Sequence, residues 1–86
     1  MTEISLAQAE EMARVSTKGE LENYEIPTGL MGQVVLSTLF EGNDRVFVLY
    51  VPGESRDAPM IVAQTRVNVK TGKVSTKVPV LTKKTS

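Results

Sequence analysis

Apolar residues recur at helical spacing near the N-terminus of the chain, at Leu6, Ala9, Met12 and Ala13. These positions form one narrow apolar stripe, which is typical of a helix that packs against a sheet. Ser5 is a good N-cap residue, and Gln8 follows it at the spacing of a capping box. Gly19 is a common type of helix stop. The pattern therefore predicts a helix over residues 5–17.

The rest of the chain has the composition of strands separated by turns. Residues 20–29 alternate acids with Tyr24 and Ile26 and then reach Pro27, which fits either a short extended segment or a loop. The later segments rich in Val, Leu and aromatic residues predict strands at about 30–40, 45–51, 60–69 and 74–81, with a frayed tail at 82–86. We therefore expect one small α+β domain over residues 1–86, with the N-terminal helix packed on an antiparallel meander sheet of about four strands.

The stretch "VNVKTGKV", residues 67–74, predicts the hairpin that joins the last two strands. A two-residue turn at Thr71 and Gly72 places Thr65 opposite Val78 and Arg66 opposite Lys77, so that one face of the hairpin is apolar or threonine and the other is polar and basic. A bulged turn with Gly72 in the left-handed conformation is the alternative. The later Pro79 cannot donate to a ladder, so the last strand is expected at an edge of the sheet.

The strand "RVFVLYV", residues 45–51, is apolar on both faces. A strand with one solvated face alternates apolar and polar residues, so both faces of this strand are expected to be covered. One helix covers only one face of a sheet. We therefore expect the second face to be covered by another copy in a homodimer, by a partner protein, or by residues 20–29 folding over it.

Composition excludes several kinds of chemistry. The 86 residues include no cysteine and no histidine, which removes disulfides, thiolate chemistry, the commonest general base and the commonest zinc ligand. The motif "TGK" lies between two predicted strands with no helix after it, so it is not a phosphate-binding loop. No apolar stretch reaches the length of a membrane span, and residues 1–15 do not resemble a signal peptide. We expect a cytoplasmic protein that is not an enzyme and has no cofactor and no metal.

Charge is divided unevenly along the chain, although the net charge is zero. Residues 1–57 hold ten acids and four bases, giving −6, and residues 58–86 hold six bases and no acid, giving +6. The candidate partner-binding residues are the cations of the hairpin and the charges of the preceding loop, namely Arg66, Lys70, Lys73 and Lys77, with Glu54, Arg56 and Asp57. Clustered cations repel each other unless acids or a partner lie nearby, and the first half of the chain has acids to supply.

The order of a helix, a strand ending in tyrosine ("RVFVLYV") and a strand running into "VNVKTGKV" resembles PepSY-type domains over about residues 45–74. It is also similar to small bacterial toxin-immunity proteins of a helix-plus-sheet plan. In the PepSY pattern an acid precedes the TGK turn, whereas Asn68 and Lys70 stand near that place here. PepSY domains are usually exported, and the absent signal favours a cytosolic binder or inhibitor instead.

Two classes of function follow from these patterns. The first is a small protein-binding module, such as an inhibitor, an immunity protein or a phage-type antagonist, with another protein as its partner. The alternative is a nucleic-acid-associated accessory protein that uses the basic hairpin. Beyond Tyr50 the sequence has no aromatic residue on which bases can stack, which weakens the nucleic-acid signal.

Overall fold

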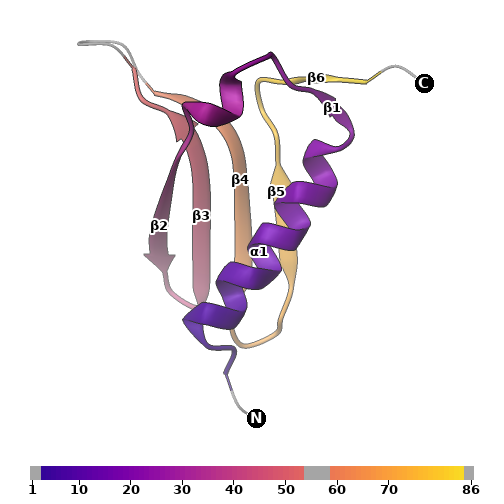
Figure 1. Ribbon diagram of the computed structural model, residues 1–86. Coiled ribbons are helices and arrows are strands. Elements are labelled where there is room, and N and C mark those ends of the chain that lie inside the picture. The colour runs from indigo at the N-terminus through magenta and orange to yellow at the C-terminus, as the bar shows by residue number, and fades with distance from the viewer. Residues whose placement is uncertain (1–2, 54–58, 85–86) are drawn as a thin grey trace.

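The computed structural model describes residues 3–53 and 59–84 (Figure 1). Its elements in chain order are α1 (Leu6–Leu21), β1 (Tyr24–Glu25), the short 3-10 helix η1 (Leu30–Gly32), β2 (Val35–Glu41), β3 (Asp44–Val51), β4 (Met60–Asn68), β5 (Val74–Lys77) and β6 (Thr82–Lys83). The four longer strands form one antiparallel sheet in the order β2-β3-β4-β5. The predicted α+β meander with an N-terminal helix packed on it is therefore confirmed, and β5 is an edge strand as Pro79 indicated.

Helix α1 begins as the sequence predicted and ends later. The backbone N–H of Gln8 donates to the Ser5 hydroxyl (3.2 Å), and the Gln8 side chain accepts from the Ser5 N–H (3.1 Å), which completes the capping box. The helix then continues past residue 17 to Leu21 and includes Gly19. A glycine inside a helix costs only about 1 kcal/mol relative to alanine. Burial of Leu21, which is 6% exposed, offsets that cost.

The strand predicted at residues 30–40 begins only at Val35, because residues 30–32 form η1. Gly29 takes a left-handed conformation (φ 82°), and the N–H of Leu30 donates to the carbonyl of Pro27 (3.1 Å). This tight turn brings Leu30 into the core, where it is 9% exposed.

The predicted frayed tail is wrong for residues 82–84. β6 pairs with β1 in a small antiparallel sheet, with Tyr24 opposite Lys83, and the N–H of Lys84 donates to the carbonyl of Asn23 (2.8 Å). Residues 85–86 lie outside the described residues. The predicted strand 74–81 correspondingly ends at Lys77, where the chain leaves the main sheet to reach β1.

The β4–β5 hairpin has the predicted faces but another register. Thr65 lies opposite Thr76 rather than Val78, which shifts the pairing by two residues. Val69 is the cause, because its N–H donates to the carbonyl of Asn43 (2.8 Å) and its carbonyl accepts from the N–H of Ile4 (2.9 Å). Val69 is therefore not available to pair with β5. A shift by two leaves every side chain on its original face, so the apolar face still points to the helix.

The hairpin loop that results is wider than a two-residue turn. The Asn68 side chain accepts from the N–H groups of Lys70 (2.9 Å) and Thr71 (3.0 Å), and the N–H of Gly72 donates to the Asn68 carbonyl (2.8 Å). Gly72 has φ 78°, as the left-handed alternative required. The loop geometry thus accounts for "NVKTG" without any ligand.

The core lies between α1 and one face of the sheet, in two apolar clusters. One is built around Ala9, Ala13, Phe47, Val67 and Val69, and the other around Leu21, Leu30, Val62 and Ala63. A bulge contributes to the second cluster, because Leu49 lies opposite Ala63 while Tyr50 lies opposite Ile61. Val62 is the additional residue of the bulge and is completely buried.

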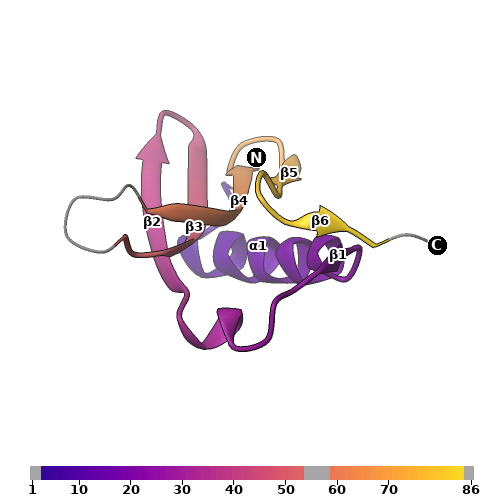
Figure 2. The same cartoon turned by 90° about the horizontal axis from the view of Figure 1, so that it is seen from above.

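Hydroxyl groups connect the helix to the sheet. The Thr65 hydroxyl contacts those of Thr17 (2.6 Å) and Thr76 (2.8 Å), and Thr76 in turn contacts the hydroxyl of Ser16 (2.7 Å). Thr65 is completely buried, and among the described residues no buried side-chain polar atom lacks a partner. This network fixes where α1 lies across the sheet: over β4, β5 and part of β3, without contact to β2 (Figure 2).

Candidate protein-binding groove

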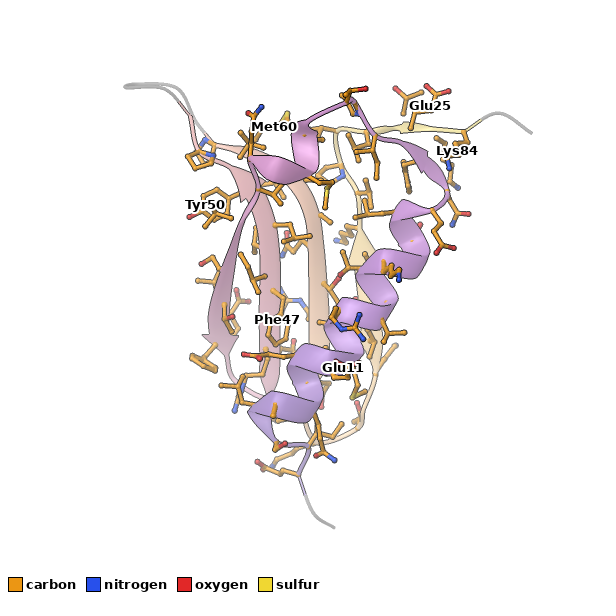
Figure 3. All side chains as sticks on the ribbon, viewed as in Figure 1. Glu11, Glu25, Phe47, Tyr50, Met60 and Lys84 are labelled. Carbon is orange, nitrogen blue, oxygen red and sulfur yellow. The ribbon has the colours of Figure 1, made fainter. Side chains whose placement is uncertain are left out.

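On its side of the sheet, α1 does not cover β2 and covers β3 only in part. A groove with a volume of about 670 Å³ lies between α1 and strands β2 and β3. We call it the helix groove. Sheet residues form the floor of the groove, α1 forms one wall, and the segment between α1 and β2 forms one end. The lining residues of these three parts are, in turn, Leu36, Phe47 and Leu49; Ala13, Thr17 and Leu21; and Tyr24, Ile26 and Met31. Figure 3 shows Phe47 on β3 beside the helix.

Charged side chains surround this apolar floor. Glu10, Arg14, Lys18 and Glu22 of α1 and Lys84 of the C-terminal segment contribute to the lining. The rim therefore carries both acids and bases, so the groove has no single sign of charge to select a strongly acidic or strongly basic ligand. An apolar hollow with a mixed polar rim is the general anatomy of a protein-binding surface.

One rim residue is held by a neighbour on the helix. Arg14 Nε donates to a carboxylate oxygen of Glu11 (3.1 Å), and its second guanidinium nitrogen contacts the other oxygen. The pKa of Glu11 lies below its ordinary value. The hydrogen bond from Arg14 is the larger cause, and the positive charge of Arg14 is the smaller one. Both side chains are exposed, so this pair contributes little to stability.

Strand β2 borders the helix groove and exposes apolar side chains on both of its faces. Leu36 (57% exposed) and Phe40 (63%) lie on the helix side, and Val35 (42%) and Leu39 (47%) lie on the other side. The Arg45 guanidinium stacks over the Phe40 ring, 4.9 Å from its centre, and covers part of it. A signal for this exposed strand was present in the sequence, because residues 34–40 contain no charged residue and no proline.

The opposite face of the sheet is also open, and it exposes apolar side chains. Val46 is completely buried, whereas Val48, Tyr50 and Ile61 border a hollow of about 400 Å³. The segment that was expected to fold over this face lies instead on the helix side, as Figure 2 shows for β1 and η1. The hypothesis that residues 20–29 close the second face is therefore wrong.

Arg66, the first candidate partner-binding residue, forms ion pairs with two acids of the same chain. It lies on the face away from α1, where its guanidinium donates to Asp44 (2.9 Å) and lies 3.2 Å from a carboxylate oxygen of Glu41. The hydrogen bonds to Asp44 and Glu41 raise the pKa of Arg66. The acidic first half thus supplies the counter-charges for this cation.

The remaining candidates are placed differently. Lys77 lies opposite Gln64 rather than Arg66, so the expected pairing of these two cations is wrong. Lys70 and Lys73 lie at the hairpin loop, and within residues 3–53 and 59–84 no acid lies in ion-pair distance of these three lysines. Glu54, Arg56 and Asp57 lie outside the described residues. Among the four described candidates, Arg66 is therefore paired with Asp44 and Glu41, whereas Lys70, Lys73 and Lys77 have no such acidic partner within the described residues.

Comparisons with known proteins identify no relative. A scan of protein-family models found no match, and searches of curated proteins and of solved structures found none either. In the described part of the chain, no helix is long and apolar enough to cross a membrane. The described residues likewise contain no group of three or more acids that could hold a metal ion.

Proposed function

We propose that this chain is a small non-enzymatic protein-binding module that acts by protein–protein contact through the helix groove. The observation that carries the proposal is the groove itself: an apolar hollow of about 670 Å³ that extends the core to the surface and ends in a mixed charged rim. Exposed apolar surface of this kind usually marks an interaction site. An inhibitor, an immunity protein or a phage-type antagonist in the cytoplasm is the kind of protein that we infer.

The groove fits an apolar segment of a partner protein better than a compact polar ligand. Its floor and walls offer few hydrogen-bonding groups, since Thr17 already contacts Thr65 through its hydroxyl. Specific small-molecule sites add several convergent polar groups that fix the ligand's orientation. A partner peptide instead gains most of its affinity by burying apolar side chains, which the exposed Ile26 (40%), Met31 (43%) and Leu36 offer.

A pair of charge substitutions tests this proposal. Random peptides displayed on phage are selected for binding to the wild-type chain, and the affinities of the enriched peptides are measured for two variants. Met31→Lys places a cation in the groove, whereas Val15→Lys places the same cation at an exposed site (57%) that does not line it. We expect Met31→Lys to lose about ten-fold or more in affinity and Val15→Lys to bind as the wild type does. Equal binding by both variants would contradict the groove.

The three lysines of the hairpin favour the second candidate, an accessory protein for nucleic acid. Lys70, Lys73 and Lys77 have no acidic partner among the described residues, so they are available to phosphates. Binding to a fluorescent single-stranded oligonucleotide at increasing salt separates the candidates. Phosphate contacts weaken steeply with salt, with a slope of about −0.7 per neutralised phosphate. A flat salt dependence, or no binding, would remove this candidate.

A further inference from the structure

The two edges of the main sheet differ in how they are protected. β5 is short (Val74–Lys77), ends with a lysine, is followed by Pro79, and contacts α1. β2 spans Val35–Glu41 with no charge before Glu41 and no contact with α1. Natural sheets block their edges with lysine, proline, short strands or a covering helix. β5 uses all four devices, whereas β2 uses none of them over residues 35–40.

The tight turn before β3 decides which backbone groups face the free edge. Gly42 and Asn43 connect Glu41 to its partner Asp44, so this first pair of the hairpin is a hydrogen-bonded pair. Hydrogen-bonded pairs alternate along an antiparallel ladder. Residues 35, 37 and 39 therefore bond to β3, and the N–H and C=O groups of residues 36, 38 and 40 point to the free edge.

We propose that this free edge pairs with β2 of a second copy of the chain, antiparallel, with Thr38 opposite Thr38 of the partner subunit. A two-fold axis through Thr38 aligns the outward groups of residues 36, 38 and 40 in both copies and overlaps the whole strand. It also puts Leu36 directly opposite Phe40 of the partner subunit on the helix side. The main sheets of the two copies then join into one continuous sheet.

The side chains explain why a second copy is the occupant. Leu36 lines the helix groove and is 57% exposed, and Phe40 is 63% exposed on the same side of the sheet. The proposed register covers each with the other, so the partner subunit contributes an aromatic ring to the edge of the groove. Such aromatic–aliphatic pairs across strands are stabilising. No charged residue lies opposite another in this arrangement, because Glu41 lies opposite Val35 of the partner subunit.

The size of the interface predicts a reversible dimer. Four half-exposed apolar side chains and one strand edge from each copy bury on the order of 1,000 Å² in total, which is at the lower limit for a specific interface. We therefore expect the oligomeric state to depend on concentration.

Cysteine substitutions test the register, because the chain has no cysteine of its own. Thr38→Cys places two thiols on the two-fold axis, where opposite residues have Cα atoms about 5.5 Å apart, within the range of a disulfide. Ser37→Cys and Leu39→Cys are matched controls, since each lies at the axis only if the register shifts by two. Under mild oxidation we expect about ten-fold more covalent dimer for Thr38→Cys than for either control.

Sedimentation of the cysteine-free wild type at increasing concentration completes the test. A shift from monomer to dimer is expected, and Thr38→Pro, which removes the outward N–H on the two-fold axis without removing a bond to β3, is expected to remain monomeric with an unchanged circular dichroism spectrum. A wild type that stays monomeric at every concentration would overturn the proposal. More covalent dimer from Ser37→Cys or Leu39→Cys than from Thr38→Cys would overturn the register. Met31→Lys tests peptide binding by the helix groove separately, at a groove residue that does not lie on β2.

Discussion

Replacing Thr65 with valine tests whether the hydroxyl network holds α1 to the sheet. Valine has nearly the shape of threonine, so the substitution replaces the hydroxyl of a completely buried side chain with a methyl group of similar size. Two contacts are lost, to the hydroxyls of Thr17 and Thr76. Thr76 keeps its contact with Ser16, so the Thr17 hydroxyl is the group that must find a new partner.

The expected cost follows from these contacts. A buried hydrogen bond contributes about 1 kcal/mol net, so two lost bonds amount to about 2 kcal/mol. The additional methyl group of valine offsets part of this loss, by up to about 0.8 kcal/mol. Thr17 is only partly buried and recovers a bond to water or to the helix backbone. We therefore expect Thr65→Val to lower the free energy of unfolding by about 1–2 kcal/mol.

Urea unfolding followed by circular dichroism measures this difference, with the slope m compared between variants to confirm a two-state transition. Thr17→Val and the double variant complete a mutant cycle, in which the two substitutions are expected to be less than additive because they remove the same bond. Thr65→Ser keeps the hydroxyl and serves as the control for lost methyl packing. If the Thr65→Val protein is as stable as the wild type, the hydroxyl contacts make no net contribution to the stability of the helix on the sheet.

Two smaller predictions concern glycine and a surface ion pair. Gly72→Ala should lower stability by about 1 kcal/mol, because φ is 78° at this residue. Gly19→Ala, inside α1 with open space around it, should raise stability by about 0.5–1 kcal/mol. Melting temperatures of the two variants that shift in the same direction would contradict this reasoning. Arg14→Gln should raise the pKa of Glu11 toward its ordinary value in a carboxyl NMR titration, whereas Lys18→Gln should not. In the wild type, the stabilisation linked to Glu11 is present above the unfolded-state pKa and is lost as pH falls through the lower folded-state pKa.

The sequence was sufficient for those parts of the fold that local patterns determine. Helical spacing and the capping box located the start of α1. The apolar runs that lie between turn segments located the ends of β3 and β4 to within one residue. The length of α1 was not predictable in this way, because Leu21 extends the helix by packing against residues that are distant in sequence. The same holds for β6, whose partner β1 lies near the other end of the chain.

The hairpin register shows how a long-range contact overrides a local pattern. Pairing around Thr71 and Gly72 satisfied both faces of the hairpin and was wrong by two residues. The deciding bonds come from Asn43 and Ile4, which hold Val69 outside the ladder. Neither residue belongs to the hairpin, so no inspection of residues 60–81 alone distinguishes the two registers. Periodicity determines which face a residue occupies, while tertiary bonds determine its partner.

The case for a second copy now rests on a different strand from the one that first suggested it. From the sequence, β3 required a cover on both faces because it is apolar throughout. In the structure, Phe47 is buried beside α1, and Val46 is buried on the opposite face, between its cross-strand neighbours Leu39 and Arg66. The central strand is therefore buried within one chain at Val46 and Phe47, while Val48 and Tyr50 stay partly exposed on the open face. The edge of the sheet is where a cover is still missing: in the described part of the chain, β2 has backbone groups without a partner and an exposed Phe40. A face-to-face dimer would leave those backbone groups unpaired, whereas pairing of two β2 strands satisfies them and covers both apolar faces of the edge.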